Sequence, residues 1–329
     1  MNLFSARKLG SRSRIRRAGL GYAGGVVTPD IAMYSLPDFR PASTHRTWTG
    51  SRWLLALLVV LPMLWHPAAA QSLRVMSFNV RLPVESDGEN RWENRRELMA
   101  RVIEEQRPDV FGTQELFKSQ GDYLVERLPK YAWFGEGRRG SEGGERDEHM
   151  GVFYRTDRLR VVESGDFWLS DTPQVPGSIT WGHPLPRMVT WALFERVADG
   201  KRFYLFNTHL PYRDEDEDAR TRGARLILQR VQALPADVPV VLTGDFNTTP
   251  DSPAHASLAE SLQDAWIASP HRKGPEATFH DFTGTPDRRI DWILQRGWQV
   301  TRGRTVTTHA HGRYPSDHFP VIATLRWPK

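Results

Sequence analysis

A carboxylate and a carboxamide stand two residues apart at the end of an apolar stretch, in Gly244-Asp245-Phe246-Asn247. The four residues before them, Val-Val-Leu-Thr, are typical of a buried strand. Side chains at positions i and i+2 of an extended segment point to the same side, so we expect Asp245 and Asn247 to face one ligand together. The alternative is an Asx turn after the strand, which is a common arrangement without a catalytic role.

Other polar residues occupy similar places, at the end of an apolar strand or just before one begins. They are Asn79, Glu115, His209, Asp291 and the pair Asp317-His318. Each residue alone has an ordinary explanation as a cap, a turn residue or a surface charge. Because the chain contains no cysteine, thiolate metal sites and cysteine nucleophiles are excluded. Carboxylate and carboxamide oxygens favour a hard cation, Mg²⁺ or Mn²⁺.

The elements that position these residues form one α/β domain over residues 71–329, without an internal linker. We expect strands at 73–80, 109–115, 149–155, 159–162, 167–170, 187–196, 202–210, 240–247, 289–294, 298–308 and 319–327. We expect helices at 90–106 with Asn90 as N-cap, at 119–128 and at 214–234, and a short helical patch at 254–267. Loops are expected at 135–147, 171–186 and 269–286.

The first 70 residues have the composition of a leader. Residues 1–52 are predicted to be a disordered basic segment, and 53–70 to be the hydrophobic region and cleavage site of a signal peptide. The apolar run 53–65 is too short for a comfortable membrane span, so we expect no stable transmembrane anchoring. Cleavage near Ala70 and Gln71 would leave an exported protein, periplasmic or secreted. Uncleaved anchoring is the alternative, and Met33 is an alternative start.

The basic charge of the chain belongs to this leader. Residues 1–70 carry nine Lys or Arg and two Asp or Glu, which leaves 35 basic against 37 acidic residues in 71–329, a net charge of −2. A nuclease needs a basic surface that follows the phosphate backbone. Nucleic acid therefore remains a possible partner, but the charge of residues 71–329 does not favour it.

Six motifs occur along the chain in a fixed order. They are SFN with Asn79, TQE with Gln114-Glu115, NTHL with Asn207-Thr208-His209, GDFN with Asp245 and Asn247, RIDWI with Asp291, and SDH with Ser316-Asp317-His318. The set resembles the endonuclease/exonuclease/phosphatase superfamily, the deoxyribonuclease I-like fold, over essentially all of 71–329, and is most similar to its exported bacterial members. The resemblance implies a four-layer α/β sandwich, in which two mixed sheets pack face to face with helices outside.

The resemblance also implies a metal-dependent phosphoesterase, an enzyme of the phosphoric ester hydrolase class. Glu115 would be the central ligand of Mg²⁺ or Mn²⁺, with Asn79 beside it and Asp317 on the opposite side. Such hydrolysis needs an activated water and stabilisation of the phosphoryl oxygens. A monomer is expected.

By the same resemblance, Asp245 would deprotonate the attacking water and Asn247 would donate hydrogen bonds to phosphate oxygens. His318, held by Asp291, would act on the phosphoryl group as an imidazolium, because a neighbouring carboxylate raises the pKa of an imidazole. His209 would assist the leaving group, with Glu148 of the EHMGVFYR stretch as its partner.

Candidates for substrate contacts are Arg187, Trp168, Phe282 and Arg313. The aromatic side chains have core packing as their alternative, and the arginines a solvated surface role. The favoured substrate is a phosphodiester. The alternatives are a nuclease acting on DNA or RNA, a sphingomyelinase-like phospholipase C, a small phosphomonoester as substrate, and a degenerate binding protein of the same fold.

Overall fold

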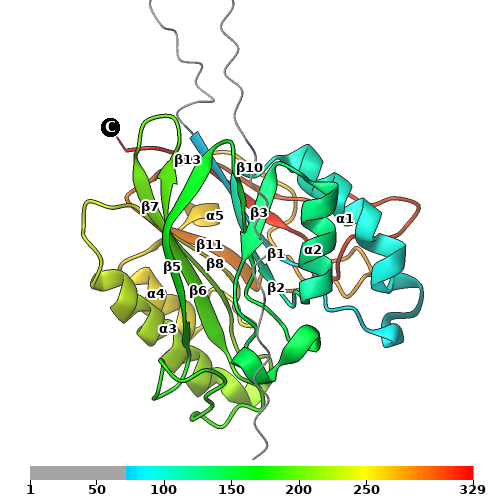
Figure 1. The fold of residues 1–329 in the computed structure, drawn as a ribbon, viewed down its shortest axis with the longest axis horizontal. Coiled ribbons are helices and arrows are strands. Elements are labelled where there is room, and N and C mark those ends of the chain that lie inside the picture. The colour runs from blue at the N-terminus through cyan, green and yellow to red at the C-terminus, as the bar shows by residue number, and fades with distance from the viewer. Residues whose placement is uncertain (1–71, 329) are drawn as a thin grey trace, which may run out of the picture. The chain divides into compact units, whose positions relative to one another are not determined.

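Two β-sheets packed face to face form the centre of this computed structural model, which describes residues 72–328 (Figure 1). The first sheet has the order β10-β12-β13-β1-β2-β4-β3. Its strands are β1 (Ser72–Asn79), β2 (Val110–Gln114), β3 (Tyr131–Phe134), β4 (Val152–Arg155), β10 (Arg272–Lys273), β12 (Gln299–Thr305) and β13 (Val321–Arg326). The pair β1–β2 is parallel and the pair β1–β13 is antiparallel, so this sheet is mixed.

The second sheet has the order β5-β6-β7-β8-β11-β9. Its strands are β5 (Leu159–Trp168), β6 (Met188–Arg196), β7 (Arg202–His209), β8 (Val240–Asp245), β9 (Gln263–Asp264) and β11 (Asp291–Arg296). It is also mixed, because β7 and β8 run parallel while β8 and β11 run antiparallel.

Helices cover the outer faces of both sheets (Figure 1). Apolar side chains of α1 (Trp92–Gln106) and α2 (Lys118–Arg127) share a buried cluster with β1 and β2. Those of α3 (Glu217–Gln232) and α4 (Pro253–Ala259) share another with β7 and β8. A short helix, α5 (Ala265–Ala268), follows β9. The expected four-layer α/β sandwich is confirmed.

The interface between the two sheets combines an apolar cluster with a polar contact. Val75, Phe194, Phe203 and Val241 belong to the buried cluster between the sheets. Nearer the end of β2, the sheets approach at Gly112, where an added Cβ would lie 2.2 Å from Asn207 Oδ1. A glycine is required there, because no other residue leaves room for the Asn207 amide.

Several elements differ from the expectation. β3 and β10 were not expected, because Tyr131–Phe134 is a short aromatic run and Arg272–Lys273 is charged and only two residues long. The strands expected at 159–162 and 167–170 are one strand, β5, with a register shift between Val161 and Glu163. Pairing with β6 keeps this strand extended through its polar middle.

The start of α1 also differs. Asn90 is not its N-cap, because Glu85–Asn90 forms the 3₁₀ helix η2 and the cap residue is Arg91. The loop expected at 135–147 contains two 3₁₀ turns, η3 (Gly140–Glu142) and η4 (Gly144–Arg146), and a third, η5 (Asp214–Asp216), precedes α3.

The leader expected at 1–52 and the signal-peptide region expected at 53–70 lie outside the described residues. Within residues 72–328, none of the helices combines the length and apolar character that crossing a membrane requires.

Candidate active site

The polar residues predicted at strand ends meet at one edge of the two sheets. In the second sheet, Asp245 at the end of β8 is paired in register with both His209 at the end of β7 and Asp291 at the start of β11. In the first sheet, Asn79 ends β1 and Glu115 directly follows β2. The fold therefore brings together residues separated by more than 200 positions in the sequence.

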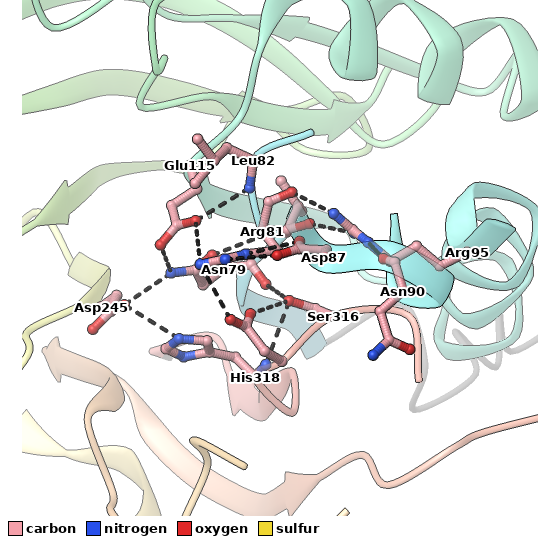
Figure 2. A network of polar contacts seen from close by, with 12 residues as sticks. Asn79, Arg81, Leu82, Asp87, Asn90, Arg95, Glu115, Asp245, Ser316 and His318 are labelled. Atoms are coloured by element: carbon pink, nitrogen blue, oxygen red, sulfur yellow. Dashed lines mark hydrogen bonds and ion pairs between the residues drawn. The ribbon is translucent and has the colours of Figure 1, made fainter. Parts of the chain in front are cut away.

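Asn79 joins the two sheets through one amide group. Its Nδ2 donates to Asp245 Oδ2 at 2.9 Å and to Glu115 Oε1 at 3.1 Å. Its Oδ1 accepts a hydrogen bond from the Arg81 backbone N–H at 3.0 Å. Asn79 thus holds the predicted base and the predicted metal ligand in a fixed relation (Figure 2).

Two carboxylates converge on the position predicted for a cation. Arg81 Nη1 lies 3.6 Å from Asp317 Oδ2 and 4.0 Å from Glu115 Oε2, so a positive group already occupies the space between them. The donors are oxygens, which suits Mg²⁺ or Mn²⁺. Asn79 presents its nitrogen to the carboxylates, so its oxygen would reach the cation only after the amide turns over. The residues fit a hard cation, with Glu115 and Asp317 as ligands.

A different group, Asp245, Asp291 and His318, is the one among the described residues that has three potential ligand atoms within 4.8 Å of one another. His318 Nδ1 is 2.9 Å from Asp291 Oδ2, the pairing expected from the sequence. Burial alone would lower the pKa of His318, but Asp291, Asp245 and Asp317 raise it to about 10. A protonated imidazole has no lone pair for a metal, so we favour the Glu115 side.

The environment of Asp245 suits a base. Burial raises the pKa of Asp245 to about 7, and the nearby Asp291 adds to this effect, while His318 and Asn79 oppose it. His318 Nε2 is 3.8 Å and His209 Nε2 is 3.6 Å from Asp245 Oδ2. Two imidazoles therefore flank the same carboxylate oxygen.

His209 and Glu148 are not brought together as expected. Among the described residues no hydrogen bond or ion pair joins them; instead, Glu148 makes two contacts with Arg138, of 2.6 and 2.8 Å. Burial, with the positive charges of Arg187 and Arg138, lowers the pKa of His209 well below its usual value. His209 Nδ1 lacks a hydrogen-bond partner. Burial and these positive charges thus favour the neutral form of the His209 imidazole.

Asp245 and Asn247 are adjacent for a different reason than predicted. The strand ends at Asp245, and Asn247 has a positive φ of 50°, so the rule for extended segments does not apply. The Asn247 backbone N–H donates to Asp245 Oδ1 at 3.0 Å, and its Nδ2 donates to Leu210 O at 3.0 Å. The turn considered as the alternative is therefore present, and it leaves Asn247 one amide hydrogen for a ligand.

Two arginines that the sequence analysis did not select support the site (Figure 2). Arg81 pairs with Asp87 of η2 at 2.8 and 3.0 Å. Arg95 of α1 is fully buried, and its guanidinium donates to backbone carbonyls at 2.7–2.9 Å. The acceptors are the carbonyls of Asn90, Val80, Pro315 and Arg81.

These contacts fix the backbone on both sides of the predicted ligands. Arg95 joins the end of β1 to Pro315, and Ser316 Oγ donates to Asn79 O at 2.7 Å. The segment with Asp317 is thereby held against the segment with Asn79. In sequence, Arg95 resembles any helix arginine, so only its position in the fold distinguishes it.

The predicted substrate contacts have mixed surroundings. Arg187 is buried, and its pKa is lowered to about 10 by burial; its Nη1 lacks a hydrogen-bond partner. Trp168 is buried, and its indole donates to Arg138 O at 2.6 Å. Phe282 is half-buried, 5.9 Å from the Arg95 guanidinium. Arg313 is half-exposed, 3.4 Å from Glu89. Arg187 is the candidate best placed to meet an anion, because it lacks a full set of acceptors.

Comparisons with known proteins agree with this geometry. A model of the endonuclease/exonuclease/phosphatase family matches residues 76–318. A solved member of that family from Bacteroides thetaiotaomicron has a TM-score of 0.73 and 33% identity, covering 78% of this chain and 98% of that one. A mannosyl-6-phosphatase from the same organism has a TM-score of 0.71 and 33% identity, covering 78% and 100%.

Curated relatives are matched over a smaller share of their own length. Tyrosyl-DNA phosphodiesterase 2 of Danio rerio is 26% identical over 236 residues, which cover 66% of this chain and 58% of that protein. The chain spans about three fifths of the length of the first curated relatives that it matches.

Proposed function

Because the chain belongs to the endonuclease/exonuclease/phosphatase family, we propose that it is a metal-dependent phosphoesterase in which Asp245 activates the attacking water. One observation carries the proposal. Asn79 hydrogen-bonds both Asp245 and Glu115, so the candidate base stands beside the candidate metal ligand. His318, held by Asp291, completes the set from the other side.

In this proposal Glu115 and Asp317 hold Mg²⁺ or Mn²⁺. When bound, the cation polarises the phosphoryl group and offsets its developing charge. The proximity of Arg81 Nη1 to both carboxylates supports the assignment, because the same two oxygens attract a positive group. Arg81 would move aside or share the site, and its ion pair with Asp87 provides an anchor.

Asp245 accepts the proton of the water as its oxygen attacks phosphorus. A pKa near the working pH is favourable for a general base, and the pKa of Asp245 is raised to about 7. The imidazolium of His318 binds a phosphoryl oxygen, and Asn247 donates its remaining amide hydrogen to another. His209, as a neutral imidazole, donates an N–H hydrogen bond to the leaving oxygen. The P–O bond to that oxygen breaks, the oxygen takes up a proton from solvent, and Asp245 afterwards releases its proton to solvent.

A phosphodiester is the favoured substrate, and a phosphomonoester is the second candidate. The solved mannosyl-6-phosphatase, at 33% identity over the whole of that chain, favours the monoester. The zebrafish relative is named a phosphodiesterase, which favours the diester or a nuclease. Arg187 suits either class, since its unpartnered Nη1 is available to a phosphate oxygen.

A substrate panel tests the proposal. The full chain would be assayed with Mg²⁺, Mn²⁺ or EDTA against bis-p-nitrophenyl phosphate, p-nitrophenyl phosphate, mannose 6-phosphate, DNA, RNA and sphingomyelin. Metal-dependent release from the diester supports the favoured function, and release from monoesters alone supports the second. If no substrate is hydrolysed with either metal, the phosphoesterase proposal is wrong.

We also propose export after cleavage near Ala70 and Gln71, on the basis of the apolar run 53–65 and its basic flank. N-terminal sequencing of protein recovered from the periplasm or medium tests this. A mature start within a few residues of Gln71 supports it, whereas protein that retains residue 50 contradicts it.

A further inference from the structure

A basic hollow lies on the first sheet, toward the end of β1 opposite to Asn79. Its volume is about 190 Å³, room for roughly six waters at about 30 Å³ each. Its lining contains Arg74, His271, Arg272, Lys273, Arg302, Arg304, Ile322 and Thr324. Arg74 is five residues before Asn79, which is roughly 17 Å along a strand. The hollow is therefore separate from the candidate active site.

Strand register brings the cations of this hollow together. Arg74 of β1 and Arg302 of β12 are both paired with Thr324 of β13, which lies between them. Directly paired residues point to the same face of a sheet, as do positions i and i+2, so Arg304 shares that face. Lys273 of β10 is paired with Arg304 on the far side. Strands β1 and β12 and the edge strand β10 thus each direct a basic side chain to one place, while β13 between β1 and β12 contributes Thr324 and Ile322.

These cations lack carboxylate partners among the described residues. Arg74 and Arg304 both donate to the single oxygen Gln106 Oε1, at 3.1 and 3.2 Å, and the Nε atoms of both have no partner. The nearest acid, Asp109, accepts from the Arg74 backbone N–H and pairs with Arg158 at 3.6 Å.

Two buried arginines elsewhere in the described chain show what a carboxylate partner looks like. Arg138 has Glu148, and Arg289 has Asp264 at 2.6 Å. In the hollow, burial lowers the pKa of Arg74, and the like charges of Arg304 and Arg302 lower it further. A concave set of guanidiniums that repel one another and lack acceptors is a site for an anion.

The extent of the cluster indicates a compact anion. On the surface near Tyr131, Arg127 pairs with Glu97 and Arg155 with Asp157. These ion pairs interrupt the basic surface beyond the hollow, whereas a nucleic-acid strand needs a continuous basic track. Guanidiniums bind phosphate oxygens in pairs, so several of them suit more than one phosphate group.

We propose that this hollow binds a diphosphate group, either free pyrophosphate or the diphosphate of a nucleotide. Arg74 and Arg304 contact it from the floor, where their Nε atoms lack acceptors, and Arg302 and Lys273 from the rim. The proposal does not depend on the function proposed for the catalytic edge.

Calorimetric titration of the full chain in EDTA tests the proposal, with pyrophosphate, ADP, inorganic phosphate and a dT oligonucleotide as probes. Pyrophosphate or ADP should bind one to one and more tightly than phosphate. Tighter binding of pyrophosphate identifies the free anion as the ligand, and tighter binding of ADP identifies a nucleotide. The variants Arg302→Gln and Arg304→Gln should each weaken binding about tenfold.

Arg225→Gln is the matched control, because Arg225 is exposed on α3 and has no ion pair among the described residues. It should leave the affinity unchanged, and all three variants should keep the unfolding transition and the hydrolytic activity of the native chain. Absence of binding, equal affinity for phosphate, insensitivity to Arg302→Gln and Arg304→Gln, or an equal loss in Arg225→Gln would overturn the proposal. Tight binding of the oligonucleotide alone would overturn it in favour of nucleic acid.

Discussion

Strand β1 connects two regions of opposite charge. At its carboxyl end, Asp245, Glu115, Asp317 and Asp291 lie around Asn79. Toward its amino end, Arg74 lies among basic side chains of β10 and β12. Like charges repel at both ends, and at each end the repulsion would be relieved by a ligand of opposite charge: a cation at the acidic end and an anion at the basic end.

The two ends differ in how they are supported. Three donors from two segments hold the acidic end: the Asn79 amide, the Arg81 guanidinium and the imidazole of His318. The basic end has the single acceptor Gln106 for two arginines. The side chains at the acidic end are thus held in place by several hydrogen bonds and ion pairs, as a catalytic site requires. The guanidiniums at the basic end have fewer acceptors than donors, as in a site that binds an anion.

The largest expected effect is at the acidic end. Asp245→Asn should lower kcat roughly 10²–10⁴-fold, because it removes a general base without changing the shape of the side chain. The fold should be as stable or more stable at pH 8, since the raised pKa of Asp245 means that its ionised form is disfavoured in the folded chain. Steady-state kinetics and urea unfolding measure both effects; a rate within a few-fold of native would exclude Asp245 as the base.

Loss of the support at the acidic end should be the next largest effect. Arg95→Met leaves four backbone carbonyls without their donor, and we expect the free energy of unfolding to fall by about 3 kcal/mol. Arg101→Met, at an exposed position of the same helix, should change it little. Equal effects of the two substitutions in urea unfolding would show that Arg95 does not hold the site.

A smaller effect is expected from changing the Asp291–His318 pair at the same end. Asp291→Asn removes a carboxylate that raises the pKa of His318 to about 10. The imidazolium is lost as pH rises through that pKa, so the alkaline fall of the rate should move to lower pH. The variant should lose about tenfold in rate between pH 7 and 9. The control Asp287→Asn, an exposed residue paired with Arg288, should keep the native pH profile. An unchanged profile for Asp291→Asn would contradict the role of His318.

The smallest effect is expected at the basic end. Arg302→Gln relieves repulsion with Arg74, so stability without added anion should stay within about 0.5 kcal/mol of native and rise rather than fall. Added pyrophosphate should then stabilise the native chain more than the variant. Urea unfolding at low salt measures both effects. A clear loss of stability without anion would show that the basic end is structural.

Sequence reasoning selected several of the residues that the fold brings together at the candidate active site. The pairing of Asp291 with His318 was expected and is present. Asp245 and Asn79 were selected because polar residues at strand ends stand out against apolar runs. Their identity as base and ligand remains a prediction. The expected pairing of His209 with Glu148 is absent among the described residues, because Glu148 pairs with Arg138 instead. Which residue Glu148 contacts depends on loop conformation rather than on residue type.

Other features gave no local indication in the sequence. Arg74 and Arg302 are far apart in the chain and meet only because β13 lies between their strands. A net charge of −2 for residues 71–329 is an average, so it conceals the separation of acidic and basic groups to opposite ends of one strand.

The sequence by itself determined that residues 71–329 form one α/β domain and which residue types stand at the strand ends, because apolar patterns and residue types can be read locally. The layered arrangement was expected only from the resemblance to the family. The tertiary structure alone decided which charges are neighbours. Register across β7, β8 and β11 places His209 and Asp291 beside Asp245, and the packing of the two sheets brings the Asn79 amide within 2.9 Å of it. Electrostatic energy depends on the distance between charges and on their burial, and neither quantity can be read from the sequence alone.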